Sequence, residues 1–428
     1  MKIQQWAAIT LATILFSGCG GKEKDVGSDL NPELTYQLFQ SSIERDTSPA
    51  IDDSGFANLS MDNNRFAVKL FKEQFNPSEN DSIFSPYSIS TALAMTYVGA
   101  GGETKTEMSN ALEFNLPEDQ LHAGFNRSLQ ALDQRNLSES GDFAAQDLLI
   151  TNAIWPYLES DPAQPFLDTL AREYGAGVYG LDYANEPEAC RIAINEQVEQ
   201  WTNGHVTDLL RSGSIKSDTH MVITSTIYFH APWNISFGPN SARPGAFQNL
   251  NGSNVDVPTM SVEAGIYKAE TEDAIFGSIP FREWTMEMLF IIPTVDFTSY
   301  AENLTAEKLN EGIAQMKSNS GIVQIPKFNL ESELKLKSNL KALGMERAFG
   351  RGADFTPMDI DNVYIEDVIH KAVIDVNEAG TTAAAATAVL IRQPSIPPRA
   401  LTVDKPFIYM IYDRENNSIL FMGHVANF

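Results

Sequence analysis

Two apolar patterns predict the secondary structure of the chain. Short runs that are alternately or continuously apolar predict strands in the second half, at Met221–Phe229, Met286–Ile292, Gly321–Ile325, Ala372–Val376, Phe407–Tyr412 and Ile419–Gly423. Helical stretches are predicted at Asn64–Phe75, Ser88–Val98, Cys190–Thr202 and Ser332–Leu343, the last of them ended by Gly344. The first half is richer in helix and the second in strand, which indicates the α+β class.

The composition predicts one large domain over residues 56–428. From about Phe56 onward, aromatic and aliphatic residues are spread evenly and no linker interrupts them. The chain is 43% hydrophobic, which is enough for a large core.

The N-terminal residues predict an export signal over residues 1–18. Met1 and Lys2 precede a short apolar stretch, Trp6 to Phe16, which is too short to span a bilayer and ends in Ser17-Gly18-Cys19. This ending resembles a bacterial lipobox, although Phe16 stands where leucine is usual, and it would make Cys19 the lipidated first residue. The alternative is ordinary secretion with an incidental cysteine.

Residues 19–55 are expected to form a flexible tether, because they are rich in Gly, Ser, Asp, Glu and Pro. They hold few core-forming residues beyond a short amphipathic piece near Leu34–Phe39. Lipidation of Cys19 would anchor the protein to the bacterial cell envelope, at the outer membrane or cell surface. Without it, the protein would be secreted and extracellular.

Composition and motifs disfavour several classes of function. The formal net charge is -26 and no basic run is interleaved with aromatics, so nucleic acid is not an expected partner. The six histidines show no metal-ligand spacing, and neither a Gly-x-Ser-x-Gly elbow nor a phosphate loop is present. Cys190 is interpreted as an incidental packed or free thiol. We therefore expect no catalytic residue, metal or cofactor.

The run from Glu378 to Ala388 is open to two interpretations. It holds no large side chain, charge or proline from Gly380 to Ala388, so its backbone suits insertion into a sheet, with Gly380 as a hinge. Alanine, however, favours helix and is common in featureless linkers. Local sequence alone leaves both open.

Several segments of the chain form a recognisable set through their order and spacing. They are Phe84–Met95, Ile227–Phe229 with Trp233, Ile325–Phe328, Leu343–Met345 with Ala353–Phe355, His370–Ala372, Lys405–Phe407 and Phe421–Asn427. Together these segments resemble the serpin family of serine protease inhibitors across residues 56–428. The resemblance implies three β-sheets, eight or nine helices, a monomer, and an exposed reactive-centre loop at about residues 378–398.

The resemblance also implies a mechanism for the alanine-rich run, which matches the hinge of inhibitory serpins. In that family a protease attacks the loop, forms an acyl-enzyme and is trapped irreversibly when the freed loop inserts into the main sheet. Serine proteases, or cysteine proteases as well, would be the partners. The alternative is a non-inhibitory serpin that binds a ligand or acts as a chaperone. The hinge residues are Glu378, Gly380, Thr381, Thr382, Ala383, Ala384, Ala385, Ala386 and Thr387.

Strand periodicity places Thr381 and Thr382 on opposite faces of the inserted strand. By resemblance, the face that carries Thr381 points inward. Pro394, Pro397 and Pro398 should end the insertable part near Gln393.

The reactive bond stays open between four candidate residues. Counting forward from Gly380 by the commonest loop length points to Pro394, whereas counting back from Lys405-Pro406-Phe407 points to Ser395. The Arg392–Gln393 bond is chemically more attractive, because arginine suits a trypsin-like pocket. Cleavage at several bonds is a further alternative.

Two further groups are implied by the resemblance. Trp233, Lys327 and Glu378 match the breach, where the loop enters the main sheet; packing or solvated charge is the alternative for all three. The second group matches the shutter beneath that sheet, where Ser225 replaces the usual asparagine partner of the histidine. Because serine is shorter, that hydrogen bond is in doubt. The shutter residues are Ser85, Ser88, Ser225 and His370.

Overall fold

The computed structural model describes residues 36–77, 81–138, 145–238, 240–360, 362–378 and 399–428. Within them the chain forms three sheets and nine α-helices. The predicted α+β class and the three-sheet architecture are confirmed.

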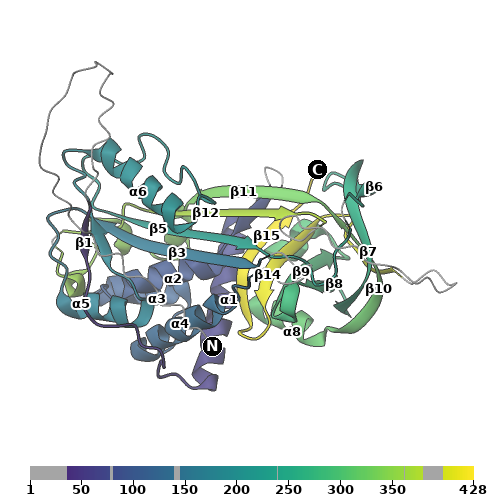
Figure 1. The fold of residues 1–428 in the computed structure, drawn as a ribbon, viewed down its shortest axis with the longest axis horizontal. Coiled ribbons are helices and arrows are strands. Elements are labelled where there is room, and N and C mark those ends of the chain that lie inside the picture. The colour runs from purple at the N-terminus through teal and green to yellow at the C-terminus, as the bar shows by residue number, and fades with distance from the viewer. Residues whose placement is uncertain (1–35, 78–80, 139–144, 239, 361, 379–398) are drawn as a thin grey trace, which may run out of the picture. The chain divides into compact units, whose positions relative to one another are not determined.

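A four-stranded sheet, called the main sheet below, carries the candidate site. Its strands are β11 (Phe328–Lys335), β12 (Asp367–Val376), β5 (Met221–His230) and β3 (Asp147–Pro156), in that order. The two outer pairs are antiparallel, whereas β12 and β5 are parallel. We call the contact between β5 and β12 the seam. Both strands run from left to right in Figure 1, so they begin at one end of the sheet and finish at the other.

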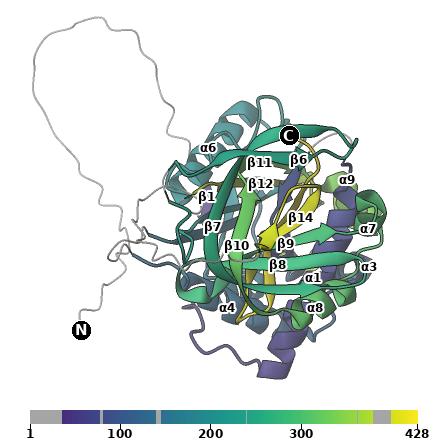
Figure 2. The same ribbon diagram turned by 90° about the vertical axis from the view of Figure 1, so that its right-hand side faces the viewer.

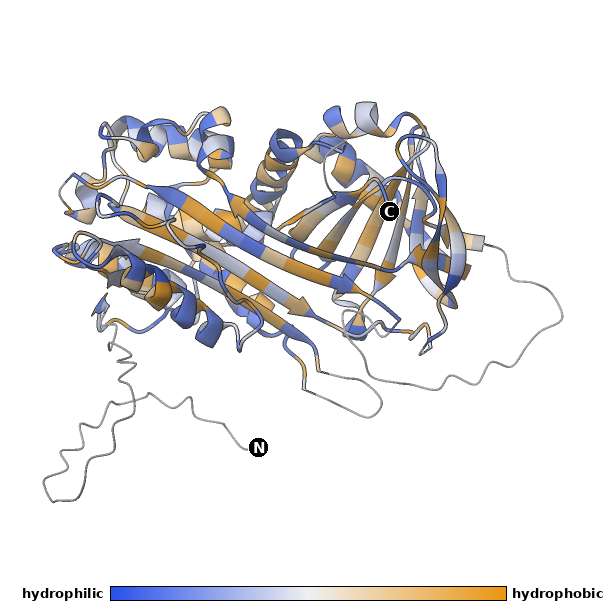
Figure 3. Cartoon of the chain, turned by 90° about the horizontal axis from the view of Figure 1, so that it is seen from above, coloured by the Kyte–Doolittle hydropathy of each residue, from blue (hydrophilic) through white to orange (hydrophobic). Residues whose placement is uncertain are grey.

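Helices cover both faces of the main sheet. In Figure 1, α6 lies above the sheet, and α1, α2, α3 and α4 lie below it. Apolar bands along the strands, orange in Figure 3, alternate with paler or blue ones. The helices are α1 (Asp53–Gln74), α2 (Pro86–Tyr97), α3 (Gly102–Leu112), α4 (Glu118–Asp133), α5 (Gln164–Thr169), α6 (Pro187–Trp201), α7 (Phe297–Glu302), α8 (Ala306–Gln315) and α9 (Lys337–Ala342).

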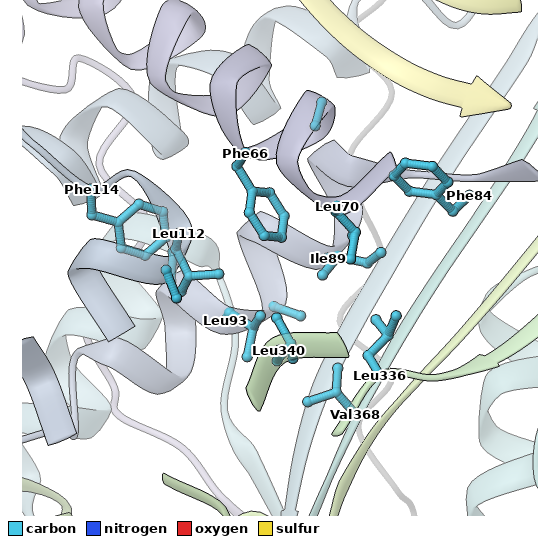
Figure 4. Packing of buried hydrophobic residues seen from close by; sticks show 14 of the residues in the cluster. Phe66, Leu70, Phe84, Ile89, Leu93, Leu112, Phe114, Leu336, Leu340 and Val368 are labelled. Atoms are coloured by element: carbon cyan, nitrogen blue, oxygen red, sulfur yellow. The ribbon is translucent and has the colours of Figure 1, made fainter. Parts of the chain in front are cut away.

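The core beneath the main sheet is built from residues far apart in the sequence. Figure 4 shows Phe66 and Leu70 of α1 with Ile89 of α2, Leu340 of α9 and Val368 of β12. All five are fully buried, with 0% of each residue exposed. Burying side chains of this size stabilises the fold by roughly 1.5–3 kcal/mol each, so α2 and the start of β12 are fixed relative to each other.

A nine-stranded sheet occupies the other end of the molecule and is seen face-on in Figure 2. Its order is β13-β10-β7-β8-β9-β14-β15-β2, with β6 paired to β7. The strands are β2 (Ser82–Phe84), β6 (Arg243–Gln248), β7 (Asn254–Glu270), β8 (Ala274–Pro280), β9 (Met286–Pro293), β10 (Lys317–Pro326), β13 (Arg399–Thr402), β14 (Phe407–Asp413) and β15 (Ser418–Val425).

Most of the predicted elements are present, and one is wrong in part. All six predicted strands lie within observed strands, and helices occupy three of the four predicted helical stretches. The stretch Ser332–Leu343, however, divides into the end of β11 and the short helix α9. Residues 332–335 pair with Ile369–Ala372 of β12, so the ladder of the main sheet overrides the local helical preference.

The folded chain begins before Phe56, inside the segment expected to be a tether. Strand β1 (Gln37–Phe39) pairs antiparallel with β4 (Val178–Gly180) to form the third, two-stranded sheet. The Arg45 side chain donates a 2.9 Å hydrogen bond to Asn126 of α4, and α1 begins at Asp53. Residues 36–55 are therefore held on the body by backbone pairing and specific side-chain contacts, which the composition did not reveal.

Candidate functional site

The three predicted breach residues lie together at the finishing end of the seam. Trp233 follows β5, Lys327 precedes β11 and Glu378 follows β12, so the same end of three strands supplies them. The Lys327 Nζ donates a 2.7 Å hydrogen bond to Glu378 Oε2. The Lys327 side chain is 35% exposed and that of Glu378 is 12% exposed. This charged pair marks the point at which the chain leaves β12.

The pKa of the Glu378 carboxyl lies below its usual value. Partial burial alone would raise this pKa, but hydrogen bonds from Lys327, from the backbone N–H of Glu378 itself and from that of Ala242, together with the positive charge of Lys327, outweigh the burial. The Glu378 side chain is therefore ionised at neutral pH and is held as a carboxylate by its neighbours.

Trp233 ties the end of β5 to the end of β12. Its ring is 1% exposed and stacks on Phe281, with the centroids 4.7 Å apart and the planes 9° from parallel. Its Nε1–H donates a 2.9 Å hydrogen bond to the carbonyl of Asn377, one residue before Glu378. This contact crosses the seam, so separating β5 from β12 at this end would break it.

The predicted shutter residues also lie together, beneath the middle of the seam. Ser85 is the N-cap of α2, and its Oγ accepts a 3.1 Å hydrogen bond from the N–H of Ser88. Ser225 of β5 and His370 of β12 are register partners in the parallel ladder. All four residues are fully buried. The cluster therefore joins the start of α2 to both strands of the seam.

The hydrogen bonds of His370 define its tautomer. Nε2 accepts a 2.9 Å bond from the N–H of Ser85, so the ring proton lies on Nδ1. Nδ1 lies 3.0 Å from the carbonyl oxygen of Ser225 and donates to it. Burial lowers the pKa of His370 to about 3, against a smaller opposing effect of the Ser225 carbonyl. His370 is thus a neutral ring that bonds backbone groups on both sides.

The short Ser225 side chain does not leave His370 without a partner, because the backbone carbonyl of Ser225 takes that role. The Ser225 hydroxyl lies 3.3 Å from Nδ1, farther than the carbonyl of the same residue, and donates instead to Ser88 Oγ at 2.9 Å. An asparagine from the neighbouring strand lies in the same cluster: Asn152 of β3 is the register partner of Ser225. With its amide nitrogen turned inward, Asn152 donates to Ser88 Oγ at 3.0 Å and to Ser225 Oγ at 3.2 Å.

Asn152 was missed by the sequence analysis, because β3 was not predicted as a strand. The apolar run that precedes and follows it, Leu148 to Trp155, carries the signal that a strand lies there. Its register with Ser225 is set by strand pairing, which no local pattern specifies.

The other predicted site residues lie outside the described residues. These are the hinge residues from Gly380 to Thr387, the reactive-bond candidates Arg392, Gln393, Pro394 and Ser395, and the lipidation residue Cys19. Cys190 lies on α6 and is buried, and burial raises the pKa of its thiol to about 12.

The described residues offer neither a metal site nor a membrane-spanning helix. No group of histidine, cysteine, aspartate or glutamate side chains in the described ranges is arranged to hold a metal ion. Among the helices of the same residues, none combines the length and apolar character needed to cross a membrane.

Comparison with known proteins identifies the family. Residues 61–428 match the family model "Serpin (serine protease inhibitor)". The leukocyte elastase inhibitor of Sus scrofa is 32% identical over 86% of this chain and 99% of its own. The native-state crystal structure of the thermophilic serpin tengpin is 28% identical, covers 92% of this chain and 100% of its own, and superposes with a TM-score of 0.80.

A structure of human thyroxine-binding globulin complexed with thyroxine is also similar. It is 26% identical, covers 87% of this chain and 99% of its own, and has a TM-score of 0.77. The chain therefore belongs to the serpin family. Members of this family are in general protease inhibitors rather than enzymes.

Proposed function

We propose that the protein is an irreversible inhibitor of serine proteases, with cysteine proteases as an alternative class of target, that traps the acyl-enzyme by inserting its cleaved loop into the main sheet. The arrangement of the seam carries this proposal. The β5–β12 contact is the parallel one in a sheet whose other pairs are antiparallel. A strand that follows β12 and turns back would run antiparallel to both β12 and β5, so inserting it would make every pair in the sheet antiparallel.

The length and composition of the loop agree with such an insertion. Fourteen residues run from Gly380 to Gln393 without proline, and extended they would span roughly 45 Å. Insertion would add on the order of ten net backbone hydrogen bonds, each worth roughly 0.5–1.5 kcal/mol. This sum rivals the roughly 5–15 kcal/mol stability of a typical domain, and it is large enough to deform a captured protease.

A second candidate function is supported by one comparison. The similarity to thyroxine-binding globulin suggests a serpin that carries a small ligand without inhibiting proteases. The small hinge residues Ala383 to Ala386 argue for inhibition, because bulky or charged hinge residues would obstruct insertion. Heating before and after cleavage of the loop distinguishes the two, since only insertion raises the heat stability of the nicked protein markedly.

The inhibitor is tested with a matched pair of hinge variants. Thr381→Arg would place a charge on the inward face of the inserted strand, so we expect slower insertion and conversion from inhibitor to substrate. Thr382→Arg carries the same charge on the outward face and should still inhibit. The measurement is the fraction of protease in a complex that survives denaturing gel electrophoresis, across trypsin-, elastase-, subtilisin- and papain-like enzymes.

The outcomes of this panel separate the hypotheses. Equal trapping by wild type and Thr381→Arg would refute loop insertion. Absence of any covalent complex with the wild type would favour the ligand-carrying alternative. Mass spectrometry of the released C-terminal peptide would show whether cleavage follows Arg392, Gln393, Pro394 or Ser395.

The proposal includes attachment to a bacterial cell envelope through a lipid on Cys19. It rests on the apolar signal and the Ser17-Gly18-Cys19 ending. Cys19→Ala should abolish labelling with radioactive palmitate and move the protein from the detergent phase to the aqueous phase. Unchanged phase partition of this variant would show that the protein is secreted without an anchor.

A further inference from the structure

A pocket lies at the starting end of the main sheet, opposite the breach. Its volume is about 250 Å³, and four segments line it. They are the residues after β3, including Tyr157 and Glu159; Tyr183 and Ala184, after β4; the residues before β5, including Asp218 and His220; and Asn362, ahead of β12. The pocket is separate from the breach and the shutter and takes no part in the trapping mechanism described above.

Aromatic rings form much of the pocket wall. Tyr157, Tyr183 and His220 line it, and the His220 ring lies 4.3 Å from that of Tyr364 and 6.3 Å from that of Tyr157. Tyr183 is held rigidly, because it is 1% exposed and its hydroxyl donates to the carbonyl of Trp155 at 2.9 Å. The wall is therefore aromatic, with Tyr183 as its fixed part.

The carboxylates that line this pocket give it a negative charge. Glu159 and Asp218 both line it and both are exposed, and neither forms an ion pair with any residue in the described ranges. No lysine or arginine among the described residues lines the pocket. Burial raises the pKa of the Tyr364 hydroxyl, and the charges of Glu366 and Asp218 raise it further against a smaller opposing effect of the Arg351 charge, so the Asp218 charge is felt at the neighbouring ring.

We propose that this pocket binds an organic cation, an alkylammonium or guanidinium group, between the carboxylates of Glu159 and Asp218 and against the rings of Tyr157 and His220. Aromatic faces attract such cations through their quadrupole, and two carboxylates that form no ion pair add a Coulombic attraction of the same sense. The same carboxylates would repel an anion. A metal ion is not expected, because the pocket contains no cluster of ligands that could hold one among the described residues.

The cation has two chemical sources, a free amine and a basic side chain of another protein. Both present the same charged group, and a pocket of about 250 Å³ accommodates either a small molecule or a single side chain. Three probes distinguish them: tetramethylammonium, free arginine, and the peptide Gly-Arg-Gly with blocked termini. A pocket for free amines should bind the first two at least as well as the peptide, whereas a side-chain pocket should favour the peptide.

The test uses the full mature chain and isothermal titration calorimetry with each probe at low salt. We expect the wild type to bind at least one probe with a Kd of about 0.1–1 mM. Asp218→Asn and Glu159→Gln should each weaken binding roughly three- to tenfold, and the double variant should bind none of the probes measurably. Both side chains are exposed, so these variants should fold normally.

The control variant is Glu302→Gln, which removes the same charge from an exposed glutamate at the end of α7. It should bind as the wild type does. The proposal is overturned if the wild type binds none of the three probes at 10 mM, or if Glu302→Gln weakens binding as much as Asp218→Asn does. Acetate is the probe of opposite charge, and acetate binding in the same pocket would overturn it as well. The binding test involves no protease. Its failure would therefore leave the proposed inhibition of proteases standing, and failure of the inhibition tests would leave the cation site standing.

Discussion

The seam is held together differently at the breach and at the shutter. At the breach, Lys327 and Glu378 form a charged pair that water reaches, with the lysine side chain 35% exposed. At the shutter, the neutral ring of His370 is fully buried and bonds the backbone of Ser85 and Ser225. An exposed ion pair contributes little because water and salt screen it, whereas a buried polar group that loses its partner is costly. The shutter should therefore contribute more than the breach to closure of the seam.

The largest expected effect is that of removing the shutter imidazole. His370→Leu would leave the N–H of Ser85 without its acceptor and the carbonyl of Ser225 without its donor, both in the buried interior. We expect the free energy of unfolding to fall by about 3 kcal/mol, measured from the first transition in urea at pH 7.5.

Ser225→Ala is the matched control for this variant. It removes the hydroxyl that donates to Ser88 Oγ but keeps the carbonyl that His370 uses. The loss should be about 1 kcal/mol or less. If Ser225→Ala destabilises the protein as much as His370→Leu, the hydroxyl rather than the carbonyl of Ser225 is the main partner of His370 Nδ1.

The sequence predicted the residues along this seam better than the strands that flank it. Trp233, Lys327, Glu378 and His370 were found because motifs that resemble a known family contain them. Their relative positions follow from strands that have strong apolar patterns, such as Met221–His230. The local pattern and the observed structure agree at strands such as β9 and β14, which are mostly apolar and buried along their whole length.

The features that were missed depend on contacts between distant segments. Asn152 reaches the shutter through the register of β3 with β5, and the end of β11 is a strand because β12 pairs with it. Strand β1 has only three residues, and its pairing with β4 overrides a polar, tether-like composition. The pocket at the starting end of the sheet gathers Tyr157, His220 and Asn362 from three loops. No local pattern contains this information, since each arrangement is a property of the packed tertiary structure.

A smaller effect is expected on the pH dependence of stability, which should differ between the shutter and the breach. His370 has a pKa of about 3 in the folded protein against an ordinary value of 6.5. Between these two pH values the imidazole is protonated in the unfolded chain and neutral in the folded one. Its contribution is fully present above pH 6.5 and falls by about 1.4 kcal/mol per pH unit below that, or about 2 kcal/mol at pH 5. Glu378 has a folded pKa below its ordinary value of 4.5, so its stabilising contribution is present above that pH and is lost only as the pH falls through the lowered pKa.

The free energy of unfolding in urea, measured from pH 7.5 to 5, should therefore fall with pH in the wild type. His370→Leu should remove this slope and Glu378→Gln should retain it, while Glu378→Gln lowers stability by roughly 1 kcal/mol or less at every pH. A slope that survives in His370→Leu would assign this acid sensitivity to other groups and would remove the thermodynamic distinction between shutter and breach.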